Sequence, residues 1–156
     1  MYTQQDFSKA KNKVTLHLCV TFAIALITLG LCLACMFARF RELNWVIAAV
    51  GSLLTALYFT LYFLPWFHYN RFLKDIRSGR SHEYDVTFLS FSDQTSLRDG
   101  VAMHDMVVSL EGDVQDEENH RLFFWDDDKE LPKLAVGQKL HIRSFGNYIT
   151  ELSDAE

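Results

Sequence analysis

The chain has 156 residues, of which 49% are hydrophobic, and a formal net charge of −5. This length allows one small soluble domain beside a membrane segment. Residues 1–81 hold nine Lys or Arg and three Asp or Glu, whereas residues 82–156 hold six and seventeen. The field of the acidic half repels nucleic acid and anionic lipid, and this excludes both as its expected ligands.

The first long segment is a polar lead-in, residues 1–13, followed by an apolar run from Val14 to Phe37 that has no formal charge. As a helix this run is about 36 Å long, enough to cross a hydrocarbon core of about 30 Å. A cleaved signal peptide is the alternative, but its apolar region is shorter, and here a second apolar run follows at once. Leu33-Ala34-Cys35 weakly resembles a lipoprotein cleavage site, although Cys32 replaces the expected Leu.

The second apolar run extends from Trp45 to Phe67, after a connection at residues 38–44. So short a connection predicts two antiparallel helices, a transmembrane hairpin over residues 14–67. Trp45 and Trp66 place aromatic rings near the two membrane interfaces. Pro65 is expected to bend or restart the helix near its exit.

Basic residues predict the orientation of the hairpin and a membrane-surface helix after it. Residues 68–81 continue a helical pattern that ends at Gly79, and their cations are expected to contact lipid headgroups. Together with the three lysines of residues 1–13, these cations bring the number of basic residues at the outer ends of the spans to seven. The turn between the spans has two. This excess places both termini in the cytoplasm, at the plasma (inner) membrane. The expected membrane-surface residues are Arg71, Lys74, Arg77 and Arg80.

Small residues recur at every fourth position on each span, which predicts close helix–helix packing in the half of the hairpin nearest the turn. The two predicted stripes are Gly30, Ala34 and Ala38 on the first span and Ala48, Ser52 and Ala56 on the second. Cys32 and Cys35 form a C-x-x-C pattern, but burial in hydrocarbon disfavours the thiolate that redox or zinc chemistry needs. Packing is therefore their expected role.

Residues 82–156 predict an acidic, cytoplasmic, all-β domain. Short runs rich in β-branched and aromatic residues alternate with turn signals. The expected strands are residues 83–91, 101–110, 120–125, 138–145 and 148–152. Five strands in about 70 residues predict a small five-stranded antiparallel barrel of OB or SH3 type.

The sequence offers no catalytic, cofactor-binding or metal-binding motif, so no cofactor is expected. Neither span contains Asp, Glu, Lys or Arg, which argues against transport by this chain alone. Acidic clusters in the tail are instead candidate contacts for a basic protein partner. They are Glu111, Asp113, Asp116, Glu117, Glu118, Asp126, Asp127 and Asp128.

Two spans followed by a small β-barrel, with the segment Val136-Gly137-Gln138-Lys139-Leu140-His141-Ile142 before the last hairpin, resemble the NfeD-like bacterial membrane proteins. The resemblance implies an OB-like tail and a scaffold role in membrane assemblies.

The preferred hypothesis is a membrane-anchored interaction or scaffold module whose barrel binds a protein partner. The expected partners are membrane lipid and either another protein or further copies of this chain, but not nucleic acid. The alternative is an accessory or regulatory subunit of a transporter or larger membrane complex. An enzyme is the least favoured class.

Overall fold

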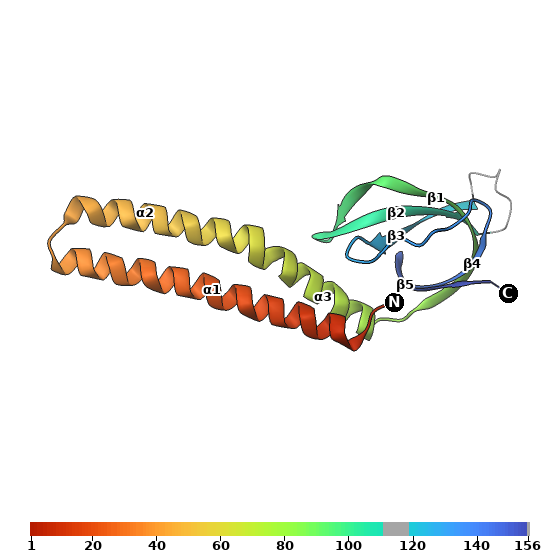
Figure 1. Ribbon diagram of the computed structural model, residues 1–156, viewed down its shortest axis with the longest axis horizontal. Coiled ribbons are helices and arrows are strands. Elements are labelled where there is room, and N and C mark those ends of the chain that lie inside the picture. The colour runs from red at the N-terminus through yellow and green to blue at the C-terminus, as the bar shows by residue number, and fades with distance from the viewer. Residues whose placement is uncertain (111–118, 156) are drawn as a thin grey trace. The chain divides into compact units, whose positions relative to one another are not determined.

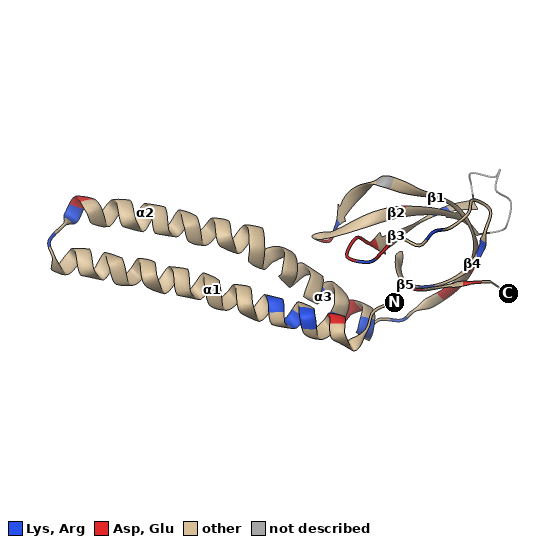
Figure 2. Ribbon diagram, in the orientation of Figure 1, with Lys and Arg blue, Asp and Glu red and all other residues tan. Residues whose placement is uncertain are grey.

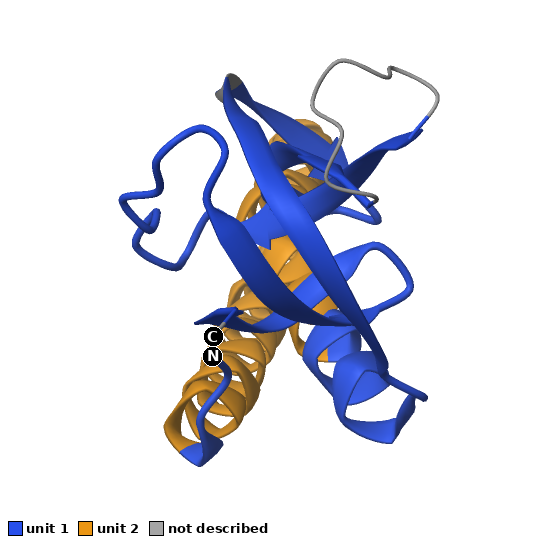
Figure 3. Ribbon diagram, turned by 90° about the vertical axis from the view of Figure 1, so that its right-hand side faces the viewer, with its two compact units in different colours: residues 1–4, 71–156 blue, residues 5–70 orange. Residues whose placement is uncertain are grey.

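The computed structural model describes residues 1–110 and 119–155. It divides into two compact units, one of Met1–Gln4 with Arg71–Glu156 and one of Gln5–Asn70 (Figure 3). The first unit contains the β-sheet domain with the end of the last helix. The second contains a pair of long helices.

The helical unit is an antiparallel hairpin (Figure 1). Its first helix is α1 (Gln4–Phe37); the second rod consists of α2 (Arg41–Tyr58), the π-helical turn η1 (Phe59–Phe63) and α3 (Leu64–Ser78). Both rods are long and apolar enough to cross a membrane. The polar lead-in is helical from Gln4, so α1 begins ten residues before the apolar run does.

The connection between the two rods is Ala38 to Phe40, shorter than the predicted seven residues. The Phe40 N–H donates to the Cys35 carbonyl at 3.0 Å, and the Arg39 N–H donates to Met36 at 3.2 Å. With Arg39 at φ +60°, these bonds form a Schellman motif, which satisfies the last carbonyls of α1. Since the motif already reverses the chain, α2 can start at Arg41.

The π-helical turn η1 lies directly before Pro65. The Leu64 N–H bonds to the Phe59 carbonyl, five residues back, in place of the α-helical partner four residues back. Pro65 has no N–H to donate, so the regular ladder must be interrupted near this point. The predicted disturbance at Pro65 is therefore present as a π-turn just upstream.

The sheet domain contains the strands β1 (His82–Arg98), β2 (Val101–Ser109), β3 (His120–Asp126), β4 (Lys139–Phe145) and β5 (Tyr148–Asp154). Among the described residues they form one closed sheet in the order β1-β2-β3-β5-β4. Closure depends on β1, which pairs with β4 over residues 82–87 and with β2 over residues 87–98.

Two details of the sheet correct the sequence prediction. The sheet is mixed, because β3 and β5 pair in parallel at Phe124 and Tyr148. The strand directions explain this parallel contact. Strand β4 runs antiparallel to β1, and β5 runs antiparallel to β4, so β5 has the same direction as β1. Strand β3 also has the direction of β1, because both are antiparallel to β2. The first strand also continues seven residues past its predicted end, since the turn is only Asp99-Gly100, both at positive φ. The polar residues read as a loop are part of a strand whose register shifts twice.

The core of the sheet domain consists of inward-facing residues from all five strands. Strand β4 shows the alternation clearly, with Leu140, Ile142 and Ser144 fully buried between more exposed neighbours. The buried hydrophobic cluster contains Val86, Phe88, Met106, Val108, Phe123, Trp125, Leu140, Ile142 and Ile149. Met1 also packs against it, which ties the start of the chain to the sheet domain.

Candidate functional site

A charged face lies on the outside of the barrel, across β1, β4 and β5. The strand register sets Asp85 opposite His141, and Arg143 opposite both Glu83 and Glu151. His141 Nδ1 lies 2.7 Å from Asp85 Oδ1. The Arg143 guanidinium lies 3.8 Å from each of its two glutamates. Three carboxylates with two basic groups leave this face rich in acceptors.

The same geometry raises the pKa of His141 above its usual value of 6.5. The hydrogen bond that the ring N–H donates to Asp85 is the largest cause, because it stabilises the protonated ring. Burial of the ring opposes it, and the charges of Asp85, Glu83 and Glu151 add to it. His141 therefore keeps its proton to a higher pH than a free imidazole does.

The predicted acidic contact residues fall into three groups. Glu111, Asp113, Asp116, Glu117 and Glu118 lie outside the described residues. Asp127 and Asp128 are exposed, and Asp127 Oδ1 lies 2.8 Å from His104 Nε2.

Asp126 is only 1% exposed, and its Oδ1 accepts the Asp128 N–H at 3.0 Å. Its carboxylate shapes the turn after β3 and is not a surface contact, which corrects the prediction for this residue.

An aromatic cluster covers the seam where β3 meets β5. The ring centroid of Tyr148 lies 5.0 Å from that of Phe72, on α3, and 5.5 Å from that of Phe124, on β3. The Arg98 guanidinium sits 4.8 Å from the Phe124 centroid. The Tyr148 hydroxyl donates to Asp99 Oδ2 at 2.6 Å.

Burial, and then the bond to Asp99, raises the pKa of Tyr148 to about 12. Sequence reasoning missed this cluster. The apolar spacing of Tyr69, Phe72, Leu73 and Ile76 was its only signal.

Two nitrogens inside the barrel have no hydrogen-bond partner in the described protein. They are His104 Nδ1 and Trp125 Nε1. These residues are directly opposite each other on β2 and β3. Buried polar atoms are normally satisfied by protein or ordered water, so this end of the barrel interior suits a water molecule.

A polar aromatic cluster joins the two rods of the hairpin. His17 Nδ1 lies 2.9 Å from the Tyr58 hydroxyl, so the two share a hydrogen bond. The rings of Tyr58 and Tyr62 stack at 5.0 Å, and Tyr62 stacks on His17 at 6.1 Å. The π-turn η1 starts immediately after Tyr58, and such turns often occur where a side chain needs a special position.

The rods are in close contact at Thr28 and Gly51. A Cβ at Gly51 would overlap the Thr28 side chain, and Gly51 is the buried residue of α2. On the predicted stripe of α1, Gly30, Ala34 and Ala38 are all exposed, and a Cβ at Gly30 would meet nothing within 4 Å. The helix pair therefore meets along a different face of α1 from the one that the spacing of small residues suggested.

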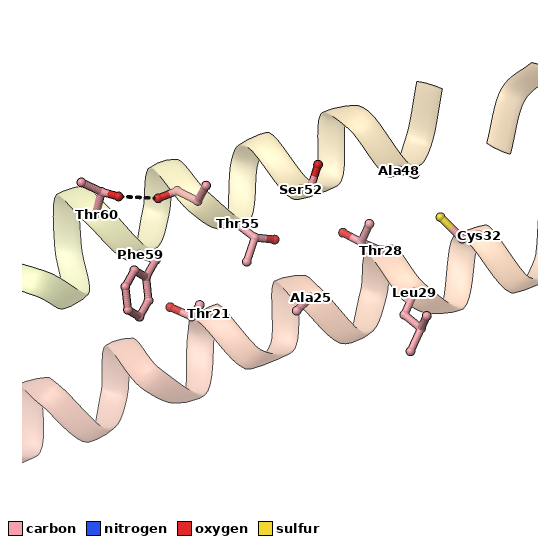
Figure 4. A pocket seen from close by; sticks show the side chains of 11 residues that line it. Thr21, Ala25, Thr28, Leu29, Cys32, Ala48, Ser52, Thr55, Phe59 and Thr60 are labelled. Atoms are coloured by element: carbon pink, nitrogen blue, oxygen red, sulfur yellow. Dashed lines mark hydrogen bonds between the residues drawn. The ribbon is translucent and has the colours of Figure 1, made fainter. Parts of the chain in front are cut away.

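A groove of about 560 Å³ runs between the rods (Figure 4). The predicted stripe of α2 lines one side of it, through Ala48, Ser52 and Ala56. Five hydroxyls in the lining donate to carbonyls of their own helices; they belong to Thr21, Thr28, Ser52, Thr55 and Thr60. The groove thus presents methyl and methylene groups and suits an apolar occupant. Cys32 also lines it and has a free thiol.

The four predicted membrane-surface cations, Arg71, Lys74, Arg77 and Arg80, are exposed. Arg71 Nε lies 4.0 Å from Asp75 Oδ2, one turn further along α3. Between them Phe72 and Leu73 are buried, so the end of α3 has an apolar side and a basic side. Figure 2 shows where these charges and the lysines of α1 lie along the helices.

No family model matches the chain, and no curated protein or solved structure is similar to it. The resemblance to NfeD-like proteins therefore depends on the layout and on the segment before the last hairpin alone.

Proposed function

We propose that this protein is a membrane-anchored interaction module, in which the hairpin holds the chain in a bilayer and the barrel binds a protein partner. The exposed apolar surface of the hairpin carries the proposal. Phe22, Ile27 and Leu53 are 60–65% exposed, and similar residues follow along both rods. So much apolar surface requires lipid or other helices to cover it.

The excess of basic residues at the outer ends of the two spans, compared with the turn, supports an orientation with both termini in the cytoplasm of a bacterial cell, at the inner membrane. The barrel then faces the cytoplasm, where a partner of basic surface meets its acceptor-rich face. Strand order supports an OB-type barrel over an SH3-type one. The supporting features are a long first strand that pairs with two neighbours and a parallel contact between β3 and β5.

Membrane integration is tested by fractionation of cells that express the full chain. A hairpin in the bilayer stays in the pellet after alkaline carbonate extraction and enters solution only with detergent. Release by carbonate would contradict the membrane anchor, whatever the barrel binds.

Partner binding is tested by purification of the full chain in mild detergent after cross-linking. Reversal of two exposed charges, Glu83→Lys with Glu151→Lys, should abolish recovery of the specific partner. Glu42→Lys, a charge reversal at another exposed position, in the first turn of α2, should leave recovery unchanged. Moderate salt present during cross-linking should weaken capture as well, because the contact is electrostatic. Equal recovery by all variants would remove the charged face from the proposal.

The groove between the rods favours a second candidate, an accessory subunit whose hairpin packs against helices of a larger membrane complex. The residues that line the groove are mostly small, and their hydroxyls already bond to their own helices. Another helix could therefore approach closely. Ser52→Leu with Ala56→Leu fills the groove from the α2 side. If these changes abolish partner recovery while the charge reversal does not, the hairpin carries the interaction.

A further inference from the structure

A second hollow, of about 460 Å³, lies along one face of the first turns of α1. It is lined by Gln5, Ser8, Lys9, Asn12, Lys13 and Leu16. These residues recur at spacings of three and four, so they share one side of the helix. Ala10 is fully buried, and at about 100° per residue most of the lining points away from it.

The chemistry of this face suits a phosphate group. Two ammonium groups, two carboxamides and one hydroxyl offer donors, and among the described residues that line the hollow none is acidic. Leu16, at the end nearer the apolar run, is 54% exposed and offers the one large hydrophobic side chain. Along the helix axis, the side chains of this face therefore change from polar hydrogen-bond donors to an apolar side chain.

The depth of the face matches that of lipid headgroups. The charge-free run begins at Val14, and a helix rises about 1.5 Å per residue, so the backbone of Lys9 lies about 7 Å before it. The headgroup layer on each side of the hydrocarbon core is itself about 5–7 Å thick. Lys13 Nζ lies 5.9 Å from the ring centroid of Trp66, an aromatic residue of the kind found at this depth.

We propose that this face of α1 binds the phosphate of an anionic phospholipid, with Lys9 and Lys13 pairing with its charge and Leu16 contacting the start of an acyl chain. The proposal rests on the membrane anchoring proposed above. It adds a defined lipid site on α1 to the membrane-surface cations of α3. The amides of Gln5 and Asn12 and the hydroxyl of Ser8 are placed to donate to the ester and headgroup oxygens.

Lys11 provides a matched control. It lies between the two site lysines in sequence, is exposed, and does not line the hollow, because it projects from another side of α1. Lys11→Gln removes the same charge at the same depth as Lys9→Gln or Lys13→Gln. General attraction to an anionic surface weakens equally in all three variants, whereas a defined site responds only to two of them.

The experiment measures binding of fluorescent phosphatidylglycerol to the full chain, purified in a non-ionic detergent, with phosphatidylcholine as the neutral probe. Each site lysine should contribute roughly fivefold to the affinity, so the double variant Lys9→Gln with Lys13→Gln should lose about 25-fold. Lys11→Gln should bind as the natural chain does. Lys9→Arg with Lys13→Arg should restore most of the binding, because the charge is kept.

Equal losses in all three single variants would overturn the site and leave only general electrostatics. Equal binding of phosphatidylcholine, or full competition by inorganic phosphate at millimolar concentration, would overturn the assignment to an anionic lipid. Carbonate fractionation of the same variants separates this failure from a failure of the membrane anchor. A chain that stays in the membrane without lipid preference contradicts only the lipid site.

Discussion

Phe72, near the end of α3, lies edge-on to the ring of Tyr148, the first residue of β5, with their centroids 5.0 Å apart. Phe72 is 7% exposed and Leu73, beside it, is fully buried. Tyr2 adds a second edge-on contact to Phe72 at 6.1 Å. The residues that enter and leave the helical hairpin thus belong to the folded unit of the barrel.

Phe72→Ala should destabilise the barrel unit by about 3 kcal/mol, because it removes a buried ring from between Tyr2 and Tyr148. The expected readout is a lower midpoint of urea unfolding of the full chain in detergent, followed by tryptophan fluorescence. Phe67→Ala, on the same helix but 43% exposed, is the control and should change the midpoint little. Similar effects of both variants would mean that α3 does not pack on the barrel through Phe72.

The sequence predicted the helical hairpin well because a bilayer-length apolar run is a strong signal of one element. It failed on which helix faces meet. Gly30, Ala34 and Ala38 have the same spacing as an interface stripe, yet a single stripe does not reveal the rotation of a helix about its axis. Gly51 and Thr28, which do meet, are separated by the turn, and their contact depends on the geometry of both rods.

The β-domain shows a similar limit. Hydrophobic alternation found the five strands of the described residues, but the extension of β1 through Ser92 to Arg98 has few apolar residues. That segment is a strand because β2 pairs with it across an Asp99-Gly100 turn, which is a tertiary cause. The acidic run that starts at Asp126 was predicted to be a surface contact, and this too depends on tertiary structure. Sequence shows its charge and does not show that the turn buries its first carboxylate.

Gly51→Ala should separate the rods of the hairpin, because the added methyl overlaps the Thr28 side chain. A reduced yield of disulfide cross-links between cysteines introduced at Ile24 and Thr55 would report this. Gly30→Ala adds the same methyl to open space and should leave cross-linking unchanged. The reverse order of effects would restore the stripe of Gly30, Ala34 and Ala38 as the interface.

Asp126→Ala should lower the free energy of unfolding of the barrel by about 2 kcal/mol, because the Asp128 N–H loses its acceptor and a buried site is left empty. Asp128→Ala, at an exposed position, should cost about 0.5 kcal/mol or less. Urea unfolding of both variants distinguishes a structural role from a surface one. Equal stability, together with weaker partner capture by Asp126→Ala, would return this residue to the contact surface.

His141 should make the barrel more stable in mild acid than in mild base. Its folded-state pKa is raised above 6.5, chiefly by the hydrogen bond that its ring donates to Asp85. A raised pKa means that the folded state binds the proton more tightly than the unfolded state does. The stabilisation is therefore fully present below about pH 6.5, the unfolded-state value. It declines as pH rises from there through the folded-state pKa.

The measurement is the thermal midpoint of the full chain in detergent between pH 5.5 and 8.5. His141→Gln and Asp85→Asn should each flatten the decline above pH 6.5, since either change removes the proton-linked bond. His82→Gln is the control, because the ring of His82 lies near Tyr84, on the same strand, and no carboxylate partner is found for it among the described contacts. A decline that is unchanged in His141→Gln would show that another group controls it. If His82→Gln instead flattens the loss of stability above pH 6.5, then His82 is the group that controls it, and His141 with Asp85 is not.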